Sequence, residues 1–70
     1  MKIKVSDYET KDILRIMREW TELTQKEFGE SIGLGDMTIY FYEKGRRRCY
    51  LDTFFKMAKT HGITITIEKK

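Results

Sequence analysis

The sequence has few of the residues that stabilise very small proteins covalently or through metals. Among 70 residues it contains one cysteine, Cys49, one histidine, His61, and no proline. One cysteine cannot form an intramolecular disulfide, and with one histidine it cannot supply the four protein ligands of a zinc site. We therefore expect no metal and no other cofactor. A lone thiol also suits a reducing compartment, so we expect a cytoplasmic protein.

Two further absences narrow the class of function. No apolar run approaches the roughly 20 residues that span a bilayer, so we expect no membrane partner. No nucleophile stands with a base and an orienting group, and His61 has no nucleophile to pair with. We therefore expect that the protein is not an enzyme.

Length and charge suggest a small, mildly basic protein. We expect residues 1–70 to form one domain, stabilised by helix packing or self-association because so short a chain buries only about 60% of its unfolded surface. Lysine and arginine number 14 against 11 acidic residues, which gives a net charge of +3. The distribution is more informative than the total. Four of the cations fall within Lys44-Gly45-Arg46-Arg47-Arg48.

Both ends of the chain alternate apolar and polar residues. Met-Lys-Ile-Lys-Val at positions 1–5 and Ile-Thr-Ile-Thr-Ile at positions 63–67 have the period of two that is typical of half-buried strands. The pattern predicts strands over residues 1–5 and 63–68. Because unpaired strands with apolar faces risk aggregation, they can pair with each other, across a dimer, or both.

Between these ends the apolar residues follow helical spacing. A first helix is predicted from Ser6, with Glu9 completing a capping box, to about Trp20; its apolar positions are Ile13, Leu14, Met17 and Trp20. A fourth helix is predicted over residues 51–61, ended by Gly62, and its expected buried face is formed by Leu51, Phe54, Phe55 and Ala58.

Two short helices are predicted in the middle of the chain, over residues 25–32 and 36–44. Thr24 and Glu27 have the spacing of a capping box at the start of the first of them. Gly33 suits a turn with positive φ, and Gly29 lets the two helices approach closely. Two short helices joined by a glycine turn are the parts of a helix-turn-helix, here over about residues 24–45.

The same segment carries a family resemblance. Thr24-Gln25-Lys26-Glu27-Phe28-Gly29-Glu30-Ser31-Ile32-Gly33-Leu34, then Thr38-Ile39, then Tyr42-Glu43-Lys44-Gly45-Arg46, resembles the Xre family, the Cro/CI-type repressors of phages and bacteria. The likeness covers about residues 13–62. It implies a mainly α fold, a four-helix lambda-repressor-like bundle, to which the alternating ends would add short N- and C-terminal β-strands.

The resemblance also implies a DNA-binding surface. Gln25 matches a phosphate-binding position; Asp36, Met37 and Phe41 match base-reading positions, with Tyr40 beside them. Lys44 and residues 46–48 match the stretch that contacts the DNA backbone. The full expected set is Gln25, Lys26, Gly35, Asp36, Met37, Thr38, Tyr40, Phe41, Lys44, Arg46, Arg47 and Arg48.

Some roles stay open at this point. Arg47 either contacts phosphate or reaches a base edge, where a bidentate contact with guanine would add discrimination. Asp36 either accepts from a cytosine amino group or only caps its helix. Met37 and Phe41 are expected to contact thymine methyl groups. Cys49, beside the basic loop, is either a structural residue or a redox sensor with a lowered pKa, and we favour the structural role.

The terminal residues predict the assembly. We expect Ile63, Ile65 and Ile67 to form a homodimer interface, which would place two reading helices about 34 Å apart on a pseudo-palindromic double-stranded operator. The predicted function is therefore a small transcriptional regulator, most simply a repressor of phage or mobile-element type. The alternative is an antitoxin that binds a toxin protein and represses its own operon.

Overall fold

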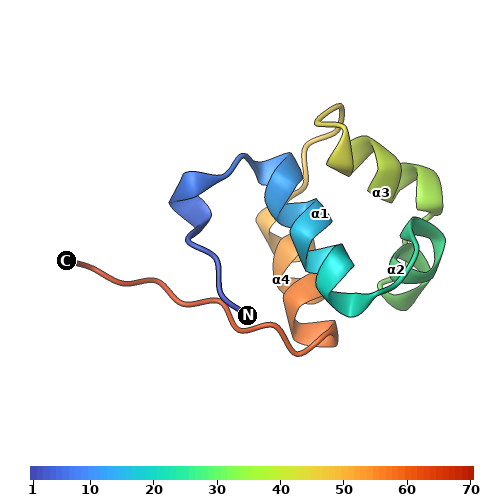
Figure 1. Cartoon of the computed structure of the whole chain (residues 1–70). Helices are drawn as coiled ribbons and strands as arrows, with labels where there is room; N and C mark the ends of the chain where they lie inside the picture. Colours follow the sequence, from blue (N-terminus) through green and yellow to red (C-terminus); the bar gives the residue numbers. More distant parts are fainter.

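A computed structural model describes all 70 residues of the chain, which form four α-helices (Figure 1). These are α1 (Thr10–Thr21), α2 (Gln25–Ser31), α3 (Asp36–Glu43) and α4 (Leu51–Thr60), preceded by one 3-10 turn, η1 (Val5–Asp7). The expected order of four helices is confirmed. None of them has both the length and the apolar composition that crossing a bilayer requires.

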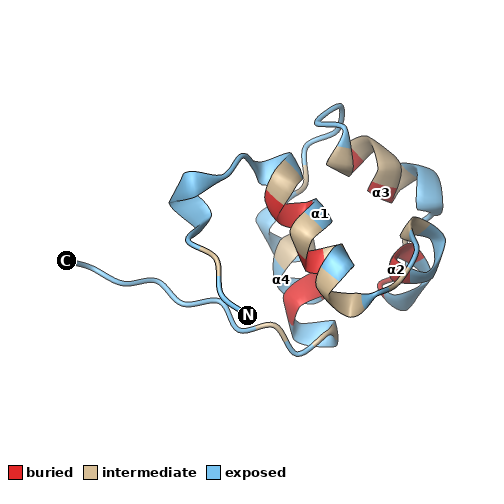
Figure 2. Ribbon diagram, in the orientation of Figure 1, coloured by how far each residue is buried: buried red, intermediate tan, exposed pale blue.

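All four helices contribute to one core, which lies between their facing sides (Figure 2). Nine buried side chains form it: Ile13, Leu14, Met17, Phe28, Ile32, Ile39, Tyr42, Met57 and Ala58. Six partly buried apolar residues pack around them: Ile3, Leu23, Leu34, Cys49, Phe54 and Ile63. Since burial of each large apolar side chain contributes about 1.5–3 kcal/mol, this small cluster is the main favourable term for the fold.

The start of α1 differs from the predicted one. Ser6 lies inside η1 and does not cap a helix, and α1 begins only after Glu9, which makes no side-chain capping bond. The amide of Asp7 donates to the carbonyl of Lys4, and the backbone at Tyr8 is extended. This local turn changes the chain direction before α1, so the capping box predicted from Ser6 and Glu9 is wrong.

The capping box predicted for α2 is confirmed. The amide of Glu27 donates to Thr24 Oγ1 at 3.1 Å, and the amide of Thr24 donates to Glu27 Oε1 at 3.0 Å. Gly33 has a φ of +77°, which a residue with a Cβ adopts only with strain. The chain therefore leaves α2 and enters α3 within four residues, 32–35.

The buried face of α4 matches the prediction only in part. Ala58 is buried and Phe54 half-buried, as expected, whereas Leu51 and Phe55 are exposed and Met57, which was not predicted, is buried. Both sets of residues have helical spacing, so the sequence pattern does not distinguish them. The packing of α4 against the other helices selects the side that carries Met57.

The strands predicted over residues 1–5 and 63–68 are absent, and this part of the expected fold class is wrong. No backbone hydrogen bond joins the two terminal segments, although they lie near one another in Figure 1. Ile3 and Ile63 instead pack against the core, and the segments flank an open groove of about 520 Å³ whose floor includes Met17, Trp20 and Phe54. A strand needs hydrogen bonds from a second strand, and neither segment has one in the single chain.

Candidate nucleic-acid interface

The turn between α2 and α3 brings the two helices close together. The amide of Leu34 donates to the carbonyl of Gly29 at 2.8 Å. A Cβ on Gly29 would lie 2.6 Å from the carbonyl oxygen of Leu34, so no larger residue fits there without movement of the backbone. The sequence prediction that Gly29 allows a close approach is confirmed, and the contact is with the turn itself.

One side of α3 is buried and the opposite side faces outward. Ile39 and Tyr42 pack in the core, as expected. Asp36 and Met37 are exposed, with 54% of Met37 accessible, and Thr38, Tyr40 and Phe41 are half-buried. The structure therefore places the residues that the sequence assigned to base reading at the start and on the outer side of this helix.

Two aromatic rings and two cations cover the outer side of α3. The rings of Tyr40 and Phe41 meet edge to face with centroids 5.6 Å apart. Lys44 Nζ lies 5.6 Å from the Tyr40 ring centroid, and the guanidinium carbon of Arg47 lies 5.6 Å from that of Phe41. Contacts of this kind are worth about 0.5–1 kcal/mol at exposed sites, enough to favour these positions of the cations.

Asp36 is the first residue of α3, and Gly35 occupies the capping position. The carboxylate of Asp36 accepts a hydrogen bond from the amide of Met37 at 3.0 Å. A negative charge at this end is favourable because the first amides of a helix carry partial positive charge. This contact holds Asp36 against the backbone of α3.

Gln25 lies at the junction of α2 and α3, and Lys26 beside it is exposed. The side-chain amide of Gln25 donates to Glu43 Oε1 at 3.3 Å. A carboxamide nitrogen carries two hydrogens, so one remains for a second acceptor such as a phosphate oxygen. The contact orients Gln25 without occupying all of its hydrogen-bonding capacity.

An ion pair that sequence reasoning missed holds this junction in place. Arg18 of α1 makes a bidentate contact with Glu43, through Nε at 2.6 Å and Nη2 at 2.9 Å, and its Nη1 donates to the carbonyl of Leu23 at 3.0 Å. The side chain of Glu43 is only 7% exposed and that of Arg18 19% exposed. The hydrogen bond to Glu43 raises the pKa of Arg18 above its ordinary value. The pair therefore links α1 to the end of α3.

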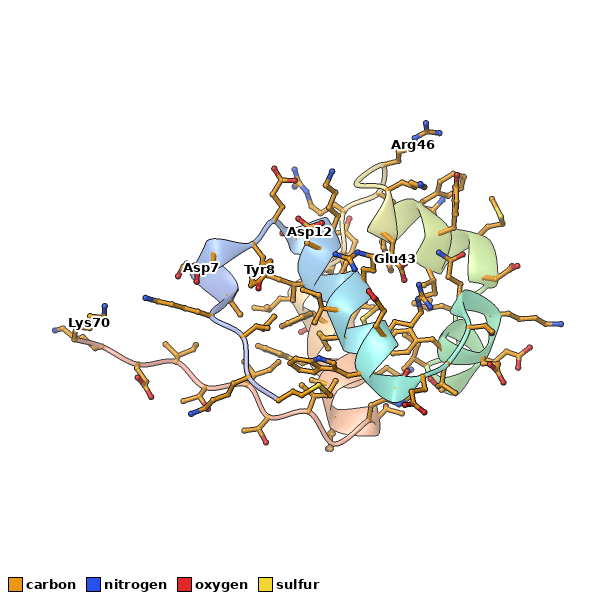
Figure 3. The ribbon with its side chains drawn as sticks, in the orientation of Figure 1. Asp7, Tyr8, Asp12, Glu43, Arg46 and Lys70 are labelled. Atoms are coloured by element: carbon orange, nitrogen blue, oxygen red, sulfur yellow. The ribbon has the colours of Figure 1, made fainter.

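The three arginines of the basic loop after α3 differ in the contacts that they make. Arg46 extends away from the helices (Figure 3), and Arg48 is exposed without a hydrogen bond or an ion pair. Arg47 folds back onto α3, where Nη1 donates to Thr38 Oγ1 at 3.2 Å. Of the three, Arg47 therefore shares the outer surface of α3 with Thr38 and Phe41.

Lys11 of α1 also reaches this loop, and the sequence did not predict it. Its aliphatic chain lies against Gly45, where an added Cβ would be 3.2 Å from Lys11 Cδ. Gly45 has a φ of +73°, so glycine is favoured there both by conformation and by space. No local sequence signal relates these two positions, because packing alone brings α1 to the loop.

Cys49 is half-buried behind the basic loop and packs on the core. Burial raises the pKa of its thiol, which lowers the fraction of reactive thiolate at neutral pH. This argues against a redox sensor with a lowered pKa and favours the structural role.

The three residues predicted for a dimer interface are not equivalent. Ile63 packs against the core, and its amide donates to the carbonyl of Ala58 at 2.8 Å. Ile65 is exposed, and Ile67 is 93% exposed. Ile65 and Ile67 are therefore the more accessible of the three, and Ile63 is partly buried.

Comparison with known proteins agrees with this architecture. A family model described as helix-turn-helix matches residues 14–67. The cryptic phage CTXphi transcriptional repressor RstR of Vibrio cholerae is 38% identical to this chain over 52 residues. The aligned part covers 74% of this chain and 47% of that protein, so the chain spans about half the length of the relative. No solved structure matches the chain.

The family match extends from Leu14 in α1 into the C-terminal segment, and so includes the whole helix-turn-helix. It confirms the resemblance carried by the motifs in residues 24–46. The chain belongs to the Xre-type helix-turn-helix family, the Cro/CI class of DNA-binding transcription regulators.

Proposed function

We propose that the protein binds double-stranded DNA sequence-specifically as a homodimer and represses transcription. The observation that supports this proposal most strongly is the set of residues on the outer side of α3. There, residues able to contact base edges lie next to a loop whose arginines have no acidic partner. An exposed short helix of this kind fits the major groove, and the flanking cations fit the phosphates.

The charge distribution supports backbone binding. Lys26, Lys44, Arg46 and Arg48 are exposed, and none forms an ion pair within the chain. Cations without internal partners can exchange their water for phosphate oxygens and release counterions from the DNA. Four such contacts in each protomer give a dimer a slope of log K against log salt of roughly −7.

The reading surface is more apolar than polar. Met37 and Phe41 have no hydrogen-bond donors, so they suit contacts with the methyl group of thymine. Asp36 is held by the amide of Met37, and its remaining acceptor capacity suits a cytosine amino group. We expect an operator in which these contacts select thymine and cytosine.

Exposed apolar residues on the terminal segments support self-association. Ile65 and Ile67 of the C-terminal segment, with Met1 and Val5 of the N-terminal one, are exposed. A two-fold dimer through this apolar surface would present two α3 helices to half-sites about 34 Å apart. Ile65→Lys is expected to lower the molecular mass in sedimentation and to weaken operator binding. An unchanged mass would contradict the interface.

Repression is the simplest regulatory outcome for such a protein. One relative of this chain is a phage transcriptional repressor. A dimer bound at an operator would block polymerase by occupying the DNA. The experiment that tests the proposed function is selection from a random pool of duplexes, read by fluorescence anisotropy at two salt concentrations. We expect a pseudo-palindrome with half-sites about 10 base pairs apart and a steep salt dependence. Weak binding without sequence preference would contradict the proposal.

A further inference from the structure

Arg47 differs from its two neighbours in the basic loop. Its guanidinium contacts Thr38 through a hydrogen bond and lies over the ring of Phe41. Arg46 points away from the helices and Arg48 makes no side-chain contact of this kind. Thr38 and Phe41 are three residues apart, so they are neighbours on one side of α3. The side chain of Arg47 therefore lies against α3, although its backbone is in the loop.

This position leaves Arg47 with unused donors. A guanidinium has five N–H groups in a rigid plane, and the structure uses one of them for Thr38. No carboxylate pairs with Arg47, so its charge is not neutralised within the chain. A planar group with two adjacent free donors matches the O6 and N7 acceptors of guanine in the major groove.

The contact with Phe41 also restricts the motion of Arg47. An arginine held against a ring and by a hydrogen bond loses less conformational entropy when it binds than one that moves freely in solvent. Phe41 itself offers an apolar edge to a neighbouring base, which suits a thymine methyl group. Thr38 and Phe41 are positioning residues for the guanidinium.

We infer that Arg47 reads a guanine in each half-site and that Phe41 contacts the methyl group of an adjacent thymine. The specificity of this protein then comes in part from a residue outside the reading helix. The inference rests on the proposed binding to double-stranded DNA and assigns the base recognised by one residue. Under this inference Arg47 contacts a base, whereas Arg46 and Arg48 contact phosphates of the DNA backbone.

The test compares matched lysine variants of two arginines in one loop. Operators are selected with the wild type, with Arg47→Lys and with Arg46→Lys, and folding of each variant is checked by circular dichroism. Lysine keeps the charge but lacks the rigid planar pair of donors that fits O6 and N7 together, so its preference for guanine is weaker. For Arg47→Lys we expect loss of preference for guanine at one position in each half-site, by about 5- to 150-fold, with the other positions unchanged. For Arg46→Lys we expect the same operator with uniformly similar or weaker binding.

A base analogue and a ring variant sharpen the result. Replacing that guanine by 7-deazaguanine, which lacks the N7 acceptor, should weaken binding of the wild type but not of Arg47→Lys. Phe41→Leu should weaken the preference for the same guanine and for the adjacent thymine. The assignment is wrong if Arg47→Lys keeps the full guanine preference of the wild type. It is also wrong if Arg47→Lys loses affinity equally for all sequences. Either result would leave DNA binding itself intact. Failure of the wild type to select any operator would overturn both proposals.

Discussion

The helix-turn-helix and the two terminal segments carry equally clear local sequence patterns, but only the first forms the predicted secondary structure. In α2 and α3 the capping box and the glycine turn are present as predicted. At the ends of the chain the alternation of apolar and polar residues produces no strand. An α-helix makes its hydrogen bonds within its own segment, whereas a strand depends on a second segment in register.

Contact with the core differs along a terminal segment even where the sequence pattern does not. Within the C-terminal segment Ile63 contacts the core, and Ile67, four residues later, is almost fully exposed. The alternation is the same at both positions. A second copy of the chain would supply the missing apolar contacts, which is why the terminal segments are the proposed dimer interface.

The largest expected effect comes from breaking the ion pair that joins α1 to the helix-turn-helix. Glu43→Ala leaves the guanidinium of Arg18 with the carbonyl of Leu23 as its one acceptor and frees the side chain of Gln25. We expect a loss of about 3 kcal/mol in the free energy of unfolding by urea, since removing one partner strands a largely buried charge. The double variant Arg18→Met with Glu43→Leu should recover most of it. A loss below 1 kcal/mol for Glu43→Ala would show that the junction does not depend on this pair.

A smaller loss is expected at the glycine turn. Gly29→Ala would place a Cβ 2.6 Å from the carbonyl oxygen of Leu34, so the turn must shift. Overpacking of this kind costs about 1–3 kcal/mol, measured by urea unfolding. Gly35→Ser is the control, because a Cβ at Gly35 meets nothing within 4 Å and serine is a good capping residue. Equal stability of the two variants would mean that the close approach at Gly29 is not required.

The C-terminal segment offers a paired test of packing against exposure. Ile63→Ala removes a side chain that packs on the core and should cost about 1 kcal/mol, less than a fully buried isoleucine. Ile67→Ala should change the stability of the monomer by less than about 0.5 kcal/mol. Both are measured by thermal unfolding at protein concentrations low enough to keep the chain monomeric. Similar losses for the two variants would contradict the difference between the two positions.

The smallest effect concerns pH and the capping box of α2. The backbone amide and then the hydroxyl of Thr24 hold the pKa of Glu27 below its ordinary value. A carboxylate with a lowered folded pKa stabilises the fold above its unfolded pKa, and this contribution is lost as the pH falls through the folded value. Titration followed by NMR should give Glu27 a lower pKa in the folded chain than in urea. Equal values would contradict the capping contact in solution.

The parts that sequence reasoning predicted are those whose interactions span a few residues. Thr24 and Glu27 are three positions apart, and the turn glycines act through their own backbone angles. The Arg18–Glu43 pair joins residues 25 positions apart, and the contact of Lys11 with Gly45 is also long-range. No pattern in a single sequence relates such positions, so neither contact was predicted.

The exposed side of α4 illustrates the same limit within one helix. Leu51 and Phe55 fit helical spacing as well as Phe54 and Ala58 do, and they were wrongly predicted to be buried. The loop arginines illustrate it at the candidate DNA interface. Their sequence predicts a basic surface, but only the fold distinguishes Arg47, which contacts Thr38 and Phe41, from Arg46 beside it.

By itself, then, the sequence determined the order of the helices, the capping box of α2, the glycine turn after it, the family and the position of the basic loop. These features depend on backbone conformation and on hydrogen bonds between near neighbours, which residue types specify directly. Tertiary structure decided which face of α4 is buried, that residues 1–5 and 63–68 form no strands, and that Glu43 binds Arg18 and Gln25. Each of these depends on which distant segment supplies a contact, and that is settled only when the helices pack.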